Sequence, residues 1–124
     1  ELAAIADPAI RARAPEITAA LDSARYQTLL HGDAKEANFC FAENEREADR
    51  GVAAVDFQYA GRGCGIKDVA YLLWDRADHV AQLDVYFRHL RARGVDAALE
   101  AEWRALYPLA RADFARFLAG WRPG

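Results

Sequence analysis

Apolar residues recur at helical spacing near both ends of the chain, whereas the middle holds only short apolar runs. In the first 25 residues, isoleucines and leucines lie at spacings compatible with a helix, in an alanine-rich background. Pro8 and Pro15 are both suited to the first turn of a helix. This segment is therefore compatible with one helix or with two short helices.

The second half of the chain predicts further helices. Asp68 and Asp78 each lie just before a segment with helical periodicity, as N-cap residues do, and Gly94 fits the C-terminal stop of the second segment. A last helix is expected to begin near Asp96. Pro108 should break or kink it, because proline lacks an N–H and its ring clashes with the preceding turn.

The middle of the chain predicts a small β segment. Three short apolar runs, at 26–30, 39–42 and 51–57, have the length and residue types of strands. The charged stretch 43–51 is expected to join the last two runs as a hairpin loop, and the glycine-rich stretch 59–65 is expected to be a flexible loop. The predicted fold class is α+β, mostly α, with the polar residues of interest on the β hairpin.

Composition and charge favour a folded domain and argue against nucleic acid or a membrane as a partner. Apolar residues make up 53% and charged residues 28% of the 124 residues, which favours one folded domain over residues 1–124. The net charge of −3 offers no basic face for nucleic acid and no polybasic patch for a membrane surface. No apolar run approaches the roughly 20 residues that span a bilayer. We therefore expect neither nucleic acid nor a membrane as a partner.

Cysteine and methionine usage adds two expectations. Cys40 and Cys64 do not form a CxxC pair, and with three scattered histidines they give no zinc pattern. Both are expected to be unpaired. With no visible signal peptide, the default setting is the reducing cytoplasm. Methionine is absent even at position 1, which indicates that the chain is a piece of a longer polypeptide.

A dense polar octet, HGDAKEAN at 31–38, carries the candidate chemistry. Asp33 and Asn38 have the spacing of the kinase catalytic loop, in which the aspartate is the base and the asparagine a magnesium ligand. Asp56, at the end of an apolar strand, matches the second metal ligand of kinases. Amide and carboxylate oxygens are the ligands that Mg²⁺ prefers. A hairpin between Asn38 and Asp56 would bring both to one side of a site.

These motifs together resemble a known group of enzymes. His31-Gly32-Asp33-x4-Asn38, followed by Val55-Asp56-Phe57-Gln58 and by Asp68-x-Ala70-Tyr71-Leu72, is similar to the aminoglycoside phosphotransferase and choline kinase group. The pattern is closest to the ecdysteroid-kinase-like, or CHK-kinase-like, branch, which the late stretch 113–121 also resembles. The resemblance runs from about residue 28 onward.

The resemblance implies a kinase-like C-terminal lobe and assigns roles to its residues. It implies an ATP- and Mg²⁺-dependent transfer of phosphate to a hydroxyl of a small molecule. Asp33 would be the base, and Asn38 and Asp56 would hold the metal and, through it, the nucleotide. Lys35 would either contact phosphate or point to solvent. Two residues would support the loop, namely His31 as a brace and Asp68 as an acceptor of backbone hydrogen bonds.

The resemblance also implies that a second lobe is needed. No glycine-rich phosphate loop and no strand of the V-A-I-K type precedes residue 31. The chain alone is therefore expected to be inactive and, with the lobe-facing surface uncovered, to self-associate. Two other interpretations stay open. The parent could be a pseudokinase-like binding or scaffolding module, or the chain could be a self-contained helical interaction domain in which the octet is accidental.

Overall fold

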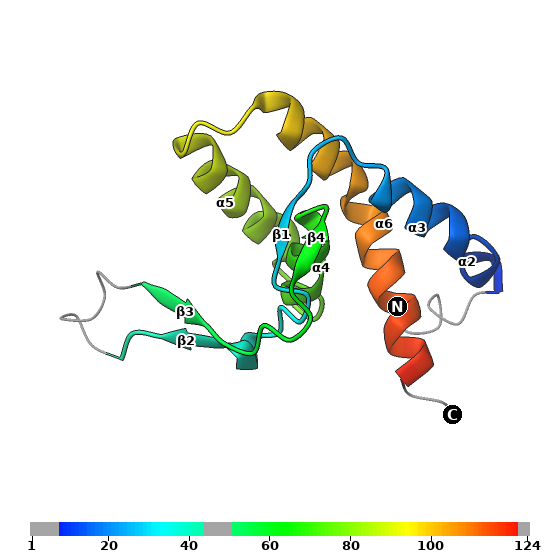
Figure 1. Ribbon diagram of the computed structural model, residues 1–124, viewed down its shortest axis with the longest axis horizontal. Helices are drawn as coiled ribbons and strands as arrows, with labels where there is room; N and C mark the ends of the chain where they lie inside the picture. Colours follow the sequence, from blue (N-terminus) through cyan, green and yellow to red (C-terminus); the bar gives the residue numbers. More distant parts are fainter. Residues whose placement is uncertain (1–7, 44–50, 122–124) are drawn as a thin grey trace.

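Helices dominate the fold, and strands occur only in its middle part. The computed structural model describes residues 8–43 and 51–121 (Figure 1). The architecture is α+β and mainly helical, as the sequence predicted. In chain order the elements are α2 (Pro8–Ala12), α3 (Ala14–Asp22), β1 (Thr28–Leu30), the 3-10 helix η1 (Glu36–Asn38), β2 (Phe39–Phe41), β3 (Val52–Ala54), β4 (Gly61–Gly63), α4 (Ile66–Leu72), α5 (His79–Ala92) and α6 (Ala97–Trp121).

The N-terminal segment forms two short helices, α2 and α3, which decides between the two predicted alternatives. Pro15 lies at the start of α3, where its missing N–H would have no helical partner in any case. α3 buries Ile17 and Leu21 against α6, so its position is fixed by packing on the longest helix.

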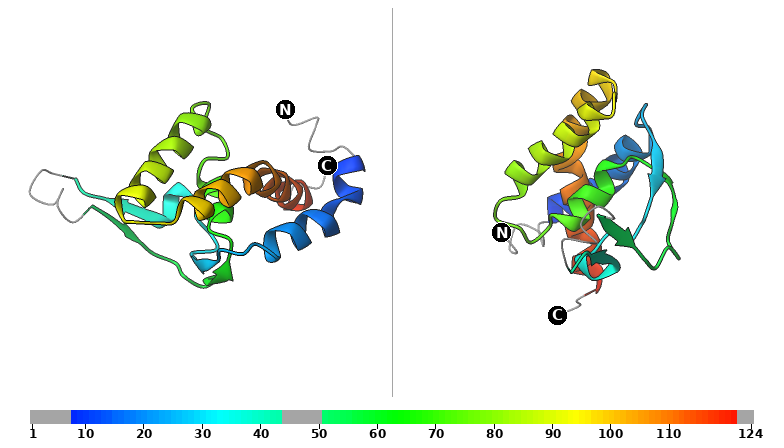
Figure 2. Two further views of the ribbon diagram at one scale, coloured as in Figure 1. Left: turned by 90° about the horizontal axis from the view of Figure 1, so that it is seen from above. Right: turned by 90° about the vertical axis from the view of Figure 1, so that its left-hand side faces the viewer.

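Two separate antiparallel strand pairs make up the β part. β2 pairs with β3 so that Phe39 lies opposite Ala54 and Phe41 opposite Val52, which confirms the predicted hairpin. The middle of its predicted loop, 44–50, lies outside the described residues. Figure 2 shows this hairpin projecting from the helices, at the opposite end of the molecule from α2.

The second strand pair corrects the predicted flexible loop at 59–65. β4 pairs with β1 in the register Thr28 to Gly63, Leu29 to Arg62 and Leu30 to Gly61. Glycine serves close packing there, because a Cβ on Gly63 would lie 2.5 Å from the Leu30 side chain. At Gly63 the glycine therefore reflects a tight contact with the paired strand rather than a loop.

The helices after the strands differ from prediction at α4 and agree at α5. α4 begins at Ile66, so Asp68 lies inside its first turn and is not its N-cap. Asp78 is the N-cap residue of α5, although its carboxylate binds Arg76 and Gln82 rather than the helix backbone. Gly94 follows the end of α5 with φ +78°, as a C-terminal stop does.

α6 passes through Pro108 without the predicted break. Its buried residues lie on both sides of the proline, so packing against α3 and α4 holds the two halves together. None of the described helices combines the length and the apolar composition needed to cross a bilayer. Cys40 and Cys64 are both free, as expected. The buried core is formed by Ile17, Leu21, Ala24, Cys64, Ile66, Val69, Ala70, Leu73, Leu83, Phe87, Trp103, Tyr107 and Ala110.

Candidate active site

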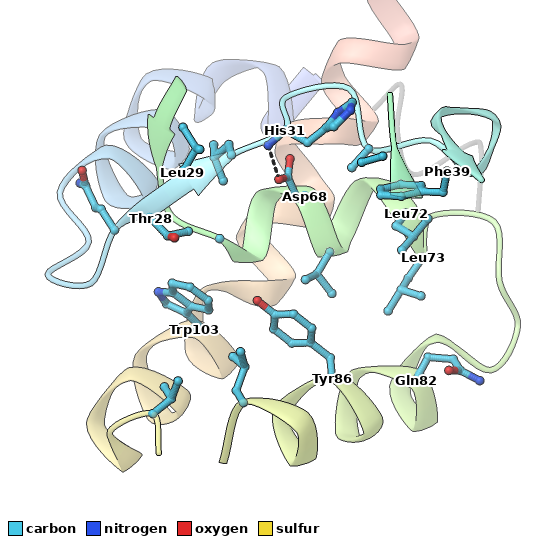
Figure 3. Close-up of a pocket in the computed structure, with 18 of the residues that line it drawn as sticks. Thr28, Leu29, His31, Phe39, Asp68, Leu72, Leu73, Gln82, Tyr86 and Trp103 are labelled. Carbon is cyan, nitrogen blue, oxygen red and sulfur yellow. Dashed lines mark hydrogen bonds between the residues drawn. The ribbon is translucent and has the colours of Figure 1, made fainter. Parts of the chain in front are cut away.

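The loop 31–38 connects β1 to β2 and is anchored to α4 through its backbone. The N–H of His31 donates to Oδ2 of Asp68 at 2.7 Å, and the N–H of Gly32 donates to Oδ1 at 3.1 Å. Figure 3 shows the first of these bonds. A carboxylate that accepts two backbone N–H groups makes charge-assisted bonds, which are stronger than neutral ones. The hydrogen bonds that the resemblance implied for Asp68 are therefore present.

The imidazole of His31 braces the loop from the other side. His31 is buried, with 9% of its surface exposed. Its Nε2 lies 2.7 Å from the Val55 carbonyl oxygen, and its Nδ1 lies 3.2 Å from the N–H of Asp33. A carbonyl can only accept and an N–H can only donate, so these partners assign the neutral tautomer with the proton on Nε2. His31 thus connects the loop to the strand that leads to Asp56.

Gly32 allows the loop to turn sharply at this point. Its φ is +88°, a region that residues with a Cβ adopt only under strain. A Cβ on Gly32 would also lie 2.2 Å from the carbonyl oxygen of Tyr59. The loop and the turn after Phe57 therefore approach each other too closely for any side chain here.

The carboxylate of Asp33 has partners at both of its oxygens. Nδ2 of Asn38 donates both to its carbonyl oxygen at 2.8 Å and to its Oδ2 at 3.0 Å. The Tyr71 hydroxyl donates to Oδ1 at 2.9 Å. Nζ of Lys35, which is half exposed, lies 3.6 Å from Oδ2. Only 14% of the Asp33 side chain is exposed, so the carboxylate is largely covered by its neighbours.

Three neighbours outweigh the effect of burial on the acidity of Asp33. Burial acts to raise the pKa of the carboxyl, but hydrogen bonds from Tyr71 and Asn38 and the charge of Lys35 lower it below the ordinary value. Burial and the negative charge of Asp33 conversely raise the pKa of Tyr71 to about 12. At neutral pH Asp33 is ionised and Tyr71 is a hydrogen-bond donor, as the geometry requires.

Tyr71, which was quoted in the motif at 68–72 but given no role, also belongs to the candidate site because it contacts Asp33. It lies on α4 three positions after Asp68, so both side chains leave the same face of the helix toward the loop. That spacing was a usable signal, because a residue one helical turn from a loop anchor is placed to reach the same loop.

The hairpin register brings Asn38 and Asp56 to one end of the β2–β3 pair. The N–H of Val55 donates to the carbonyl of Asn38 at 2.9 Å, which continues the pairing of Phe39 with Ala54. Asp56 follows directly, with φ +63° and an exposed side chain. Within residues 8–43 and 51–121, the Asp56 carboxylate has no hydrogen bond or ion pair to another side chain.

This donor set fits Mg²⁺. The side-chain nitrogen of Asn38 donates to Asp33, so the Oδ1 atom of Asn38 is available as a ligand. The Asp56 carboxylate is unengaged within the described chain. Both are hard oxygen donors. No group of three or more histidine, cysteine, aspartate and glutamate side chains gathers among the described residues. Mg²⁺ commonly binds with one or two protein ligands and takes the rest from water and phosphate.

A large apolar cavity lies behind the loop and not at these polar groups. It has a volume of about 760 Å³ and is bounded by β1, α4, α5 and the start of α6. In Figure 3, Tyr86 of α5 points into it, with Leu72 and Trp103 on its other sides. His31 and Asp68 line one edge, whereas Asp33, Asn38 and Asp56 do not line it. Its mainly apolar lining is unsuited to phosphate groups.

Comparison with known proteins supplies a family for this arrangement. Residues 1–109 match the model of the APH family, described as the phosphotransferase enzyme family. The comparisons with curated proteins and with solved structures found no match. The matched region includes the loop 31–38, the β2–β3 pair and α4, and it covers most of the 124 residues. The chain therefore belongs to the phosphotransferase enzyme family.

Proposed function

We propose that the protein transfers the γ-phosphoryl group of ATP, with Mg²⁺, to a hydroxyl group of a small molecule. The observation that carries this proposal is the arrangement of Asp33. Its carboxylate is held at both oxygens by Tyr71, Asn38 and Lys35, while the hairpin register sets Asp56 beside Asn38. A fixed base next to two oxygen ligands for a metal is the set of groups that phosphoryl transfer requires.

Asp33 is proposed to accept the proton of the acceptor hydroxyl. An ionised carboxylate with a low pKa is a weak base, which suits a reaction in which the proton leaves late. The second lone pair of Oδ1 is available to such a hydroxyl, because only Tyr71 occupies that oxygen. His31 and Asp68 keep the loop in place and make no contact with reactants in this proposal.

Asn38 and Asp56 are proposed to hold the metal and, through it, the nucleotide. When bound, Mg²⁺ supplies positive charge against the charge on the phosphate oxygens. Lys35 is proposed to contact the transferred phosphate. Its Nζ lies 3.6 Å from Asp33 and half of its side chain is exposed, so the ammonium can turn from the carboxylate toward a phosphate.

The role of Asp33 is tested by the Asp33→Ala variant of the intact protein. We expect phosphate transfer from ATP to a hydroxylated acceptor to fall by about a thousandfold or more, because the base and its fixed position are both lost. Asp75→Ala is the matched control, since Asp75 is exposed and lies outside the loop. Transfer is measured as ADP release in an acceptor screen, and folding by circular dichroism. Full activity in Asp33→Ala would contradict the assignment.

The metal roles are tested by the Asp56→Asn variant and by chelation. EDTA is expected to abolish transfer, and added Mg²⁺ to restore it. Asp56→Asn removes one charged ligand and keeps the shape, so a higher Mg²⁺ concentration should be needed for half-maximal rate. An unchanged Mg²⁺ dependence in this variant would show that Asp56 is not a ligand.

Several finer features belong to this proposal. We place the protein in the ecdysteroid-kinase-like branch and in the cytoplasm. We also propose that residues 1–124 are one domain, the C-terminal lobe, and that an N-terminal lobe supplies the rest of the ATP site. The support is the motif pattern, which is similar to the part of the kinase fold that carries the base and the metal ligands. A lysine-bearing strand paired with a helical glutamate in the parent sequence would favour an enzyme over a pseudokinase-like module.

Self-association of the isolated chain is a further part of this proposal. Large apolar side chains are exposed along the strands and the turn after Asp56, including Leu29, Phe41, Phe57 and Tyr59. Exposed apolar surface of this kind tends to find a partner. Light scattering over a range of concentrations tests it, and a strictly monomeric chain at high concentration would contradict it.

A further inference from the structure

We propose that Tyr71 is a positioning residue, whose hydroxyl sets the orientation of the Asp33 carboxylate toward the acceptor. The inference rests on the proposed function of Asp33 as the base. It concerns a residue outside the octet and outside the metal ligands, on a different element of the fold. Three observations support it, namely the partners of the two carboxylate oxygens, the support of the Tyr71 ring, and the second link between α4 and the loop.

The two oxygens of Asp33 are held unequally. Oδ2 faces the amide of Asn38 at 3.0 Å and the ammonium of Lys35 at 3.6 Å. Oδ1 has a single partner, the Tyr71 hydroxyl at 2.9 Å. Rotation of a carboxylate about its last torsion is only weakly restricted by its own geometry. Because the two oxygens turn together, Tyr71 and Asn38 set this torsion jointly, with Tyr71 acting on the side of Oδ1. Oδ1 is the oxygen with a lone pair left for an acceptor hydroxyl.

The ring of Tyr71 is itself held by aromatic packing. Its centroid lies 4.2 Å from that of Phe114 on α6, and Phe114 also contacts Trp74 at 5.3 Å and Phe117 at 6.0 Å. Tyr71 is partly buried in this cluster. A phenol whose ring is packed in this way loses little further freedom when its hydroxyl makes a bond. The position of the hydroxyl is thus set by the packing of α4 on α6.

α4 consequently holds the loop at two points. Asp68 fixes the backbone at His31 and Gly32, and Tyr71 fixes the side chain of Asp33. The two anchors are one helical turn apart on a single rigid element. α4 therefore fixes both the loop backbone and the Asp33 carboxylate. A base held in this way keeps a constant distance to the acceptor.

The decisive experiment compares Tyr71→Phe with Tyr86→Phe in the intact protein. Both replacements remove one hydroxyl from a partly buried helical tyrosine, and no hydrogen bond of the Tyr86 hydroxyl is found among the described residues. For Tyr71→Phe we expect kcat to fall about tenfold, because the carboxylate turns out of line, while KM for ATP changes less than twofold. Tyr86→Phe should keep both constants. A merely structural role would not separate kcat from KM in this way.

Each result bears on the inference in a distinct way. If wild-type protein transfers phosphate and Tyr71→Phe keeps its kcat, Tyr71 does not position the base. If kcat and KM for ATP change together, the role is structural and the inference is wrong. Absence of transfer by the wild type would refute the proposed function itself. Should Tyr71→Phe fail to fold by circular dichroism, Phe114→Leu decides, since it keeps the hydroxyl, removes the ring support and is expected to lower kcat about threefold.

Discussion

The two aspartates of the candidate site stand in opposite environments. Asp33 is largely buried and receives donors from Asn38 and Tyr71. Asp56 is exposed, has φ +63°, and has no side-chain partner within the described residues. The chain itself therefore supplies the hydrogen-bond donors for Asp33. Asp56 has a strained backbone conformation, and its carboxylate makes no hydrogen bond or ion pair within the described residues that would offset the strain.

This difference agrees with the two roles proposed for these residues, a base for Asp33 and a metal ligand for Asp56. A base must be fixed before the reactants arrive, so its hydrogen bonds are made by the protein. A metal ligand gains its bonds only when the metal binds, and strained, unengaged groups are typical of such positions. Substitutions around Asp33 should therefore cost stability as well as activity, whereas loss of the Asp56 carboxylate should cost activity with only a small effect on stability.

The largest effect on stability is expected for Gly32→Ala. A Cβ there would meet the Tyr59 carbonyl oxygen at 2.2 Å, and the backbone has φ +88°. We expect a loss of about 3 kcal/mol or more in the free energy of unfolding. Gly94→Ala is the matched control, because Gly94 has φ +78° and nothing within 4 Å of the added carbon. Its cost should be only about 1 kcal/mol. Equal losses in urea denaturation would show that the close approach to Tyr59 carries no cost.

A smaller loss is expected for Asp68→Asn. The asparagine keeps the shape but loses the charge and one acceptor oxygen, so one of the two loop N–H groups is left without its partner. The expected cost is about 2 kcal/mol, the range for a hydrogen bond to a charged group. Hydrogen exchange of the amides of His31 and Gly32 should accelerate. The exposed Asp75→Asn serves as control, and equal behaviour of the two variants would refute the anchoring role.

The anchors of the loop show which connections of the candidate site a short sequence motif does not contain. Asp33, Asn38 and Asp56 were proposed as site residues because their spacing is a local motif, and their roles stay predictions. The structure shows that Asn38 contacts Asp33 and that the hairpin register sets Asp56 beside Asn38. Asp68 was correctly expected to bind the loop, yet its place at the start of α4 was wrong, since capping is judged from a few neighbouring residues. Its carboxylate is used 37 residues away in sequence instead. A contact over that separation leaves no trace in local periodicity.

The strand β4 and the contact of Tyr71 with Asp33 were not predicted, for related reasons. Glycine is depleted in strands, so 59–65 predicted a loop, but pairing with β1 and close packing on Leu30 override that preference. The Tyr71 hydroxyl has a role only once α4 is placed against the loop. The hairpin was predictable because β2 and β3 are neighbours in sequence. The long-range β1–β4 pair and the α4 contacts depend on the whole fold.

The link between Tyr71 and Asp33 also predicts a dependence of stability on alkaline pH. Burial, together with the hydrogen bond to Asp33 and its charge, raises the pKa of Tyr71 from 10.0 to about 12. The folded state thus holds the proton more tightly than the unfolded state. The stabilisation is complete below pH 10 and is lost as pH rises from 10 toward 12, by about 1–2 kcal/mol. The wild type should therefore be more stable than Tyr71→Phe below pH 10, and this difference in the free energy of unfolding, measured by urea denaturation, should shrink between pH 10 and 12. A constant difference across it would contradict the coupling.

The smallest change in the free energy of unfolding is expected for substitutions of Asp56, and one of them should increase stability. Glycine adopts φ +63° without strain, so Asp56→Gly should raise the free energy of unfolding by about 0.5 kcal/mol, after the extra freedom of glycine in the unfolded chain is subtracted. Asp56→Ala removes the same carboxylate but keeps the strain, and should lose about 0.5 kcal/mol. Both variants should lose Mg²⁺-dependent transfer, so the difference between them isolates the backbone. If Asp56→Gly is less stable than the wild type in thermal denaturation, the carboxylate has a structural partner, and the contrast with Asp33 fails.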